Sequence, residues 1–139
     1  MEETANFTDH PELPAGFTYF GQFLDHDITF DKTDGLPSGQ LSLEEIVQGR
    51  SPSLDLDSLY GRGPALEGKR LYEDDGIHLR IGRTSPAGPP GTAEGSVLPN
   101  DLPRGDNAED VREASIGDPR NDENLVVAQT HLAFLKFHN

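Results

Sequence analysis

The chain has 139 residues, of which 33% are hydrophobic and 26% charged, and its 25 Asp and Glu against 11 Lys and Arg give a formal net charge of -14 at pH 7. This acidity argues against nucleic acid and against an anionic membrane surface as partners, since both require basic side chains. The absence of cysteine excludes disulfide bonds, thiolate nucleophiles and zinc–thiolate sites. No segment approaches the roughly 20 apolar residues of a membrane span, and the first residues lack the pattern of a signal peptide. We expect a soluble protein, and the sequence leaves its location inside or outside the cell open.

The first predicted element is a helix over residues 16–30, which contain no proline. Their aromatic and β-branched residues make a strand the competing interpretation. A short helical turn is expected from Leu54 to Tyr60, before Gly61 ends it. Residues 77–81 alternate as a short strand does, and the glycine- and proline-rich residues 82–106 predict an extended loop.

The last segment, residues 121–139, has the strongest helical pattern. Asn121 or Asp122 is the expected N-cap, and Lys136 and His138 lie near the C-terminal end, where the helix dipole favours basic groups. Apolar residues cover nearly the whole circumference of this helix, which is typical of a helix inside a larger protein. We therefore expect a mainly α fold with long irregular loops and little or no β structure, and a chain that is a fragment of a larger domain.

The helix over residues 16–30 carries polar groups on two faces. Gln22 and His26 share one face with Asp25 beside them, whereas Asp27 falls within the apolar arc. A buried carboxylate is costly without a partner, so a bound cation is one interpretation and a solvated Asp at a frayed helix end is the other. His26 has the chemistry of a general acid or base, although a lone histidine on a helix is more often structural.

A second group of oxygen-bearing side chains alternates along residues 51–58. Its members are Ser51, Ser53, Asp55 and Asp57. Carboxylates, hydroxyls and free backbone carbonyls are the ligands that Ca²⁺ prefers, but the loop is not an EF-hand, because Tyr60 stands where that motif needs glycine. The competing interpretation is that Asp55 or Asp57 caps a helix. A calcium site that also includes Asp27 would provide the partner that Asp27 lacks.

Arg120 and Glu123 lie three residues apart at the start of the last helical segment. This spacing allows both side chains to point toward one site. The competing interpretation is a surface ion pair of Arg120 with Asp118 or Glu123, which contributes little to stability. Nothing in the sequence by itself brings Arg120 to His26.

Three motifs resemble those of one known family. Residues 21–27, Gly-Gln-Phe-Leu-Asp-His-Asp, resemble the distal-histidine motif of the animal-type haem peroxidases, the peroxidase–cyclooxygenase superfamily. Residues 51–61 are similar to the family's calcium loop, and residues 117–123, Gly-Asp-Pro-Arg-Asn-Asp-Glu, to its distal-arginine motif. With their flanks the motifs cover about half of the chain, in the family's order, and look most like bacterial members. The resemblance implies that residues 1–139 are the distal-side part of a haem peroxidase domain and a fragment of its fold.

The resemblance implies a role for each matching residue. His26 matches the base that takes a proton from peroxide, Arg120 the group that stabilises charge as the O–O bond breaks, and Gln22 a residue that holds water or halide. Asp25 and Glu123 match carboxylates that form ester bonds to haem b in some members, and the resemblance leaves open whether they do so here. The Ca²⁺ ligands that it implies are Asp27, Ser51, Ser53, Asp55 and Asp57.

The resemblance does not extend to the proximal histidine that binds the iron, since neither His131 nor His138 matches its position. The parent protein is expected to be a peroxidase that reduces hydrogen peroxide with a small-molecule or halide donor, in response to oxidative stress. We expect the isolated chain to take up haem weakly and to need the rest of the domain for activity. Two alternatives stay open: a haem fatty-acid dioxygenase of the same superfamily, and a non-catalytic calcium- or haem-binding remnant.

Overall fold

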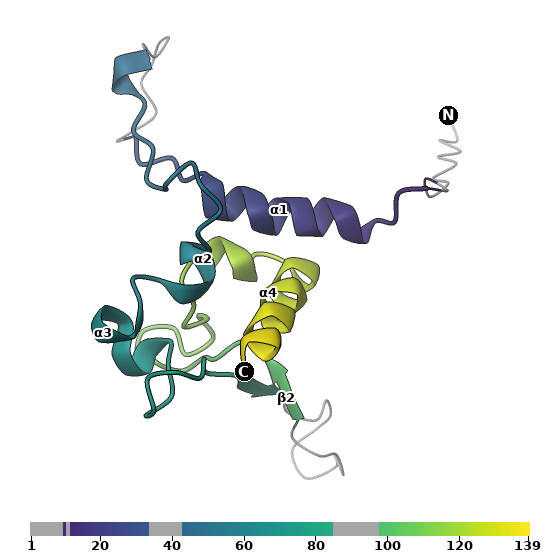
Figure 1. Ribbon diagram of the computed structural model, residues 1–139. Helices are drawn as coiled ribbons and strands as arrows, with labels where there is room; N and C mark the ends of the chain where they lie inside the picture. Colours follow the sequence, from purple (N-terminus) through teal and green to yellow (C-terminus); the bar gives the residue numbers. More distant parts are fainter. Residues whose placement is uncertain (1–9, 11, 34–42, 85–97) are drawn as a thin grey trace.

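The computed structural model describes residue 10 and residues 12–33, 43–84 and 98–139 (Figure 1). The described part is mostly helical, with irregular connections and one small sheet, as the predicted mainly α class requires. Among the described helices, none is long and apolar enough to cross a membrane. In chain order the elements are α1 (Gly16–Ile28), η1 (Leu43–Glu45), α2 (Asp57–Tyr60), α3 (Pro64–Glu67), η2 (Gly68–Arg70), β1 (Gly82–Thr84), β2 (Leu98–Asp101), η3 (Pro119–Asp122) and α4 (Leu125–His138).

The prediction of one unbroken loop over residues 82–106 is wrong, because β1 and β2 lie within this range. Strands β1 and β2 pair antiparallel, with Gly82 opposite Asp101 and an irregular register between the two ends of β1. Gly82 makes this pairing possible, because a Cβ atom at that position would lie 1.9 Å from the carbonyl oxygen of Leu102. Residues 85–97 of the predicted loop lie outside the described residues.

Residues 77–81, predicted as a strand, do not form one. Among the described residues they make an isolated β-bridge, between Leu79 and Tyr72. The side chain of Asn139 makes the hydrogen bonds to Leu79 that a neighbouring strand would otherwise make. Its Oδ1 accepts from the Leu79 N–H (2.8 Å) and its Nδ2 donates to the Leu79 carbonyl (2.8 Å). Of the alternating apolar residues only Leu79 is buried, whereas Ile77 is 66% exposed. The backbone groups of Leu79 are satisfied by a distant side chain.

The two shorter helical predictions are confirmed with different ends. Helix α1 ends at Ile28, because Thr29 is extended and bonds back to the carbonyl of Asp25 through its N–H and its hydroxyl. Helix α2 begins at Asp57 and not at Leu54. The residue before it, Leu56, has a left-handed backbone conformation (φ 59°) that no helix interior accepts.

The last predicted helix is divided into the 3-10 turn η3 and helix α4. The expected cap at Asn121 or Asp122 is wrong, because the N-cap of α4 is Asn124, whose Oδ1 accepts from the N–H groups of Val126 and Val127. Helix α4 buries one face and leaves other apolar residues exposed, with Phe137 90% exposed. The buried residues of α4 are Val127, Ala128, His131, Leu132 and Leu135.

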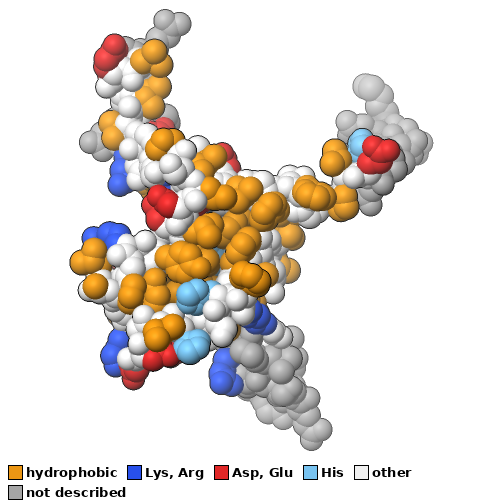
Figure 2. All heavy atoms as spheres, in the orientation of Figure 1, with side chains coloured by type: hydrophobic (Ala, Val, Ile, Leu, Met, Phe, Trp, Pro, Cys, Tyr) orange, Lys and Arg blue, Asp and Glu red, His pale blue; other side chains and the backbone are white. Residues whose placement is uncertain are grey.

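The core lies between this face of α4 and the segments on either side of β1 and β2. Its fully buried members include Leu59, Leu79 and Leu102. Helix α1 lies across α2, η3 and α4 (Figure 1), where the buried ring of Phe23 stacks on Phe134 at a centroid distance of 4.7 Å. Figure 2 shows apolar side chains gathered in this region of the molecule. The packing of α1 on α4 brings the first and the last motif of the chain together.

Candidate functional site

The candidate active site is built from α1 and from the turn that precedes α4. Gln22 and His26 lie one turn apart on α1, and Glu123 lies between η3 and α4. Gln22 Nε2 donates a hydrogen bond to Glu123 Oε1, and His26 Nε2 lies 3.7 Å from the same carboxylate oxygen. The structure thus brings three of the predicted site residues together across about one hundred positions of sequence.

His26 is 7% exposed, and its second ring nitrogen has a buried partner. Nδ1 lies 2.8 Å from Asn121 Oδ1. The amide nitrogen of Asn121 in turn donates to Nδ1 of His131, at 2.9 Å. Both Asn121 and His131 are 0% exposed, so this chain of hydrogen bonds runs through the packed interface of α1, η3 and α4.

Sequence reasoning did not find the parts played by Asn121 and His131. The sequence predicts Asn121 as a helix cap, and His131 does not match the position of the iron ligand that the resemblance implies. One signal was present, since His131 lies four positions after Val127 and four before Leu135, on the face of α4 that enters the core. A histidine in the middle of such a face requires a buried polar partner.

Arg120 points away from this group of side chains. Its Nη2 donates to the carbonyl oxygens of His26 (2.9 Å) and Thr29 (2.6 Å), at the C-terminal end of α1, and to Asp118 Oδ2 (2.7 Å). The guanidinium also lies over the ring of Phe30, 4.7 Å from its centroid. A cation at this end of a helix is stabilised by the helix dipole. Arg120 therefore holds the backbone that carries His26, and no described contact joins its guanidinium to the Glu123 carboxylate.

The ion pair between Arg120 and Asp118 is not the surface pair of the competing interpretation, because Asp118 is 0% exposed. Arg50 also donates a hydrogen bond to the same carboxylate (2.7 Å). Burial alone would raise the pKa of Asp118, but hydrogen bonds from Arg120 and Arg50 outweigh it and hold that pKa below its ordinary value. Asp118 thus stays charged and joins residues 117–123 to Arg50, which directly precedes the predicted calcium loop.

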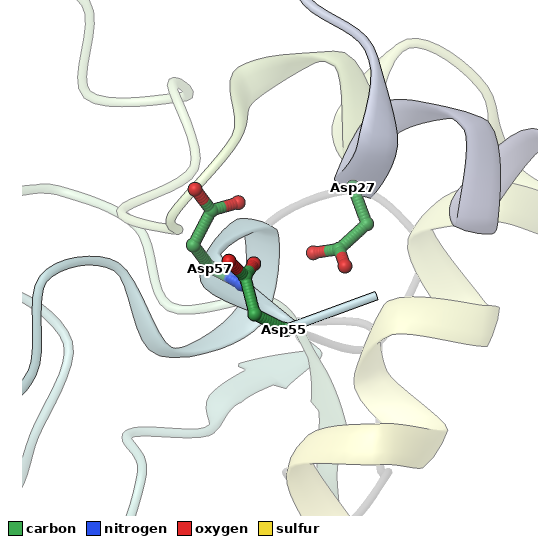
Figure 3. Close-up of side chains that lie close together, drawn as sticks. All are labelled: Asp27, Asp55 and Asp57. Atoms are coloured by element: carbon green, nitrogen blue, oxygen red, sulfur yellow. The ribbon is translucent and has the colours of Figure 1, made fainter. Parts of the chain in front are cut away.

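The candidate metal site lies on the other side of α1. Asp27, Asp55 and Asp57 each offer one carboxylate oxygen, and these oxygens lie within 4.8 Å of one another (Figure 3). Ca²⁺ binds its ligands at about 2.3–2.6 Å, so two ligands of one ion are separated by at most about 5 Å. The three aspartates fit a common Ca²⁺ ion in both chemistry and spacing.

Asp27 is 0% exposed, so the interpretation as a solvated residue at a frayed helix end is wrong. Its two oxygens accept from the backbone N–H groups of Leu56 (2.9 Å) and Ser58 (3.1 Å). These bonds connect α1 to the start of α2 without neutralising the charge. Each oxygen has a second lone pair, which remains open to a cation.

Arg50 is the basic residue nearest to the candidate metal site that the described contacts show. Its Nη1 lies 3.0 Å from Asp57 Oδ1, but that buried oxygen has no hydrogen-bond partner among the described residues. Burial raises the pKa of Asp57 above its ordinary value, Arg50 lowers it, and the carboxylates of Asp55 and Asp27 add to the rise. Arg50 is shared with Asp118, so the three aspartates keep an excess of negative charge.

The remaining predicted site residues are exposed. Ser51 and Ser53 lie in the irregular segment before α2, and the carbonyl of Ser53 accepts from the N–H of Asp55 (3.0 Å). Asp25 lies on the exposed side of α1, next to the buried His26. No described contact joins the Asp25 carboxylate to Glu123.

Gly117 lets the segment before η3 approach the candidate metal site closely. A Cβ atom at this position would lie 2.4 Å from the carbonyl oxygen of Ser58 and 2.8 Å from that of Asp57. Glycine is therefore required where the chain enters η3 beside α2.

We expect Gly117→Ala to lower the free energy of unfolding by about 2 kcal/mol, because backbone atoms must move to admit the methyl group. Urea denaturation of the two proteins measures this difference. Gly21→Ala is the matched control, since a Cβ atom there meets nothing within 4 Å and alanine favours a helix interior by up to about 1 kcal/mol. Equal stability of Gly117→Ala and the wild type would contradict the close approach.

Comparison of the chain with models of protein families, with curated proteins and with solved structures found no match.

Proposed function

We propose that this chain forms the distal side of a haem peroxidase site, in which His26 exchanges a proton with hydrogen peroxide, and that the adjacent aspartates bind Ca²⁺. The first support is the contact of His26 and Gln22 with Glu123. This contact joins two of the segments that carry the family resemblance, residues 21–27 and 117–123, which lie far apart in the sequence. The second support is the fit of Asp27, Asp55 and Asp57 to one cation.

The residues present fit the peroxide side of a haem group. His26 is shielded from solvent, yet its Nε2 has no hydrogen-bond partner among the described residues, and the Glu123 side chain beside it is 47% exposed. The partly exposed Glu123 carboxylate therefore borders both the imidazole Nε2 and the Gln22 amide. When bound, haem b supplies the iron at which peroxide is reduced.

Each residue then has a defined task. His26 accepts a proton from peroxide at Nε2 and returns it to the leaving oxygen. Gln22, which is held by Glu123 and by Asn124 (3.4 Å), orients water or a halide beside it. Arg120 holds the last turn of α1 through the carbonyl of His26, and the nearby Asp25 and Glu123 are the carboxylates that could be joined to haem by ester bonds.

The two sites share helix α1. His26 and Asp27 are neighbours in sequence, and Asp27 bonds to the start of α2 while His26 bonds to η3. A Ca²⁺ ion held by Asp27, Asp55 and Asp57 would therefore stabilise the helix that positions the imidazole. The metal has a structural task in this proposal and takes no part in proton transfer.

The proposal is tested by substitution of His26 in the haem-loaded chain. Imidazole in solution stands in for the iron ligand that the rest of the domain would supply, and haem occupancy is matched between the variants by their Soret absorbance. The rate of peroxide-dependent oxidation of a phenolic donor is then measured. We expect His26→Leu to lower this rate at least about 100-fold, as loss of a general base does. His78→Leu is the matched control, because His78 is exposed and pairs with Asp75 away from the site.

Equal rates for wild type and His26→Leu would overturn the proposed function. Conversion of linoleate to a hydroperoxide by the same preparation would favour the dioxygenase alternative. Binding of Ca²⁺ by a chain that gives no His26-dependent oxidation would favour the non-catalytic alternative.

A further inference from the structure

The imidazole of His26 is the first member of a buried chain of three polar side chains, and two of them have no task in the proposed function. Nδ1 of His26 meets Oδ1 of Asn121 at 2.8 Å, and Nδ2 of Asn121 meets Nδ1 of His131 at 2.9 Å. All three residues are buried, His26 at 7% exposure and the other two at 0%. Which ring nitrogen of a histidine carries the proton is decided by the hydrogen bond that its other nitrogen makes.

We propose that His131, acting through Asn121, is a positioning residue that holds His26 in the tautomer with the proton on Nδ1 and a free lone pair on Nε2. This inference rests on the proposed function for its purpose, since a proton acceptor at Nε2 needs that tautomer. Its geometry and its test are independent of haem and of peroxide.

The argument starts at the buried end of the chain. The amide nitrogen of Asn121 can only donate, so Nδ1 of His131 has to accept, and His131 carries its proton on Nε2. Burial lowers the pKa of His131 to about 4, against the opposing effect of Asp118 and Asp122. At neutral pH His131 is therefore uncharged and keeps the lone pair that the Asn121 amide requires.

The orientation of Asn121 then determines the tautomer of His26. With Nδ2 directed to His131, the amide oxygen faces His26 Nδ1, where it can only accept. The same orientation serves before and after proton transfer, because Nδ1 of His26 donates in both states. In the reversed orientation, the amide nitrogen of Asn121 would donate to Nδ1 of His26. Once Nε2 had gained a proton, Nδ1 would carry one too, and two N–H groups would face each other, so the buried hydrogen bond of His26 would break.

His131 has no second role among its described contacts. Its Nε2 has no hydrogen-bond partner among the described residues, and its ring meets Phe23 edge to face at 5.8 Å. An apolar side chain of similar size would fill this part of the core but would leave the buried amide nitrogen of Asn121 without its acceptor. A histidine here is explained by the acceptor that it presents to Asn121.

The tautomers are read directly from two-bond ¹H–¹⁵N correlation spectra of the full 139-residue chain, labelled with ¹⁵N at histidine and recorded at mildly alkaline pH. We expect His26 in the Nδ1–H form and His131 in the Nε2–H form. Free histidine prefers Nε2–H, so the result expected for His26 is opposite to the result without a partner. Signals are assigned by single His→Gln substitutions.

The variants separate the parts of the chain of hydrogen bonds. Asn121→Leu and His131→Phe should each shift the tautomer ratio of His26 about tenfold toward Nε2–H, which corresponds to loss of one hydrogen bond. Asn121→Asp keeps the acceptor for His26 and should retain its tautomer. His131→Gln restores an acceptor for the amide of Asn121 and should rescue the ratio, whereas Leu135→Val is the control for lost packing on the same face of α4.

His26 in the Nε2–H form in the wild-type chain would overturn this inference, and that measurement needs no variant to fold. An unchanged ratio in both Asn121→Leu and His131→Phe would overturn it as well. The proposed function fails separately, through equal oxidation rates of wild type and His26→Leu, and that failure would leave the spectra of the apoprotein unaffected.

Discussion

As the pH falls from about 6.5 to about 4, we expect the free energy of unfolding of the wild-type chain to fall by about 3 kcal/mol more than that of His131→Gln. The reason is the burial of His131, which lowers its pKa from 6.5 to about 4 in the folded chain. In this interval the unfolded chain binds a proton at His131 and the folded chain does not. Acid therefore favours the unfolded state, and this contribution to stability is fully present above about pH 6.5.

Urea denaturation at a series of pH values measures this effect as the difference between the two proteins. Subtraction removes the contributions of the many carboxylates, which titrate in both. Leu135→Val is the matched control and should keep the wild-type pH dependence, because it removes packing from the same buried face of α4 and no titratable group. Parallel pH profiles of wild type and His131→Gln would show that His131 titrates in the folded chain as it does in the unfolded one.

For the candidate metal site we expect Asp27→Asn to weaken the binding of Ca²⁺ at least about 100-fold, since the affinity of such sites depends on the number of charged ligands. Asp27 is the buried member of the cluster and faces both Asp55 and Asp57 (Figure 3). The amide oxygen of asparagine still accepts one of the two backbone N–H groups that the carboxylate accepts. Isothermal titration calorimetry with Ca²⁺ measures the affinity.

The matched control for this experiment is Asp25→Asn, which removes the same charge from the exposed side of the same helix, two residues away. Removal of Ca²⁺ with a chelator should lower the midpoint of thermal unfolding of the wild type and of Asp25→Asn, because a ligand that binds only the folded chain stabilises it. Asp27→Asn should show no such shift. Equal affinities of Asp27→Asn and wild type would remove Asp27 from the metal site.

The two helical segments were predictable because their patterns are local. Residues 16–28 lack proline and alternate polar and apolar groups at helical spacing, and α1 occupies them. The same spacing put Asp27 in the apolar arc, where it is buried. The N-cap at Asn124 was missed because Asn121, Asp122 and Asn124 are all good caps, and only the buried partners of Asn121 decide between them.

The small sheet and the contacts of Leu79 with Asn139 were not predictable, because they join residues that are far apart in the sequence. Strand β1 is three residues long and begins with a glycine that the carbonyl of Leu102 approaches closely, and only Thr84 among its residues favours a strand. Leu79 obtains its backbone partners from the side chain of Asn139, 60 residues away. Such contacts depend on packing and leave no mark in the local pattern.

The sequence by itself determined the chemistry of this protein: the acidic composition, the absence of thiols, and three short motifs that hold an imidazole, an amide, a guanidinium and a set of carboxylates. The tertiary structure decided how these groups are used. It joined His26 to Asn121 over 95 positions and buried His131 behind them, and it directed Arg120 to the end of α1. The physical reason is that composition and periodicity act on neighbours in sequence, whereas a buried polar group takes whichever partner the packing of α1 on α4 brings within reach.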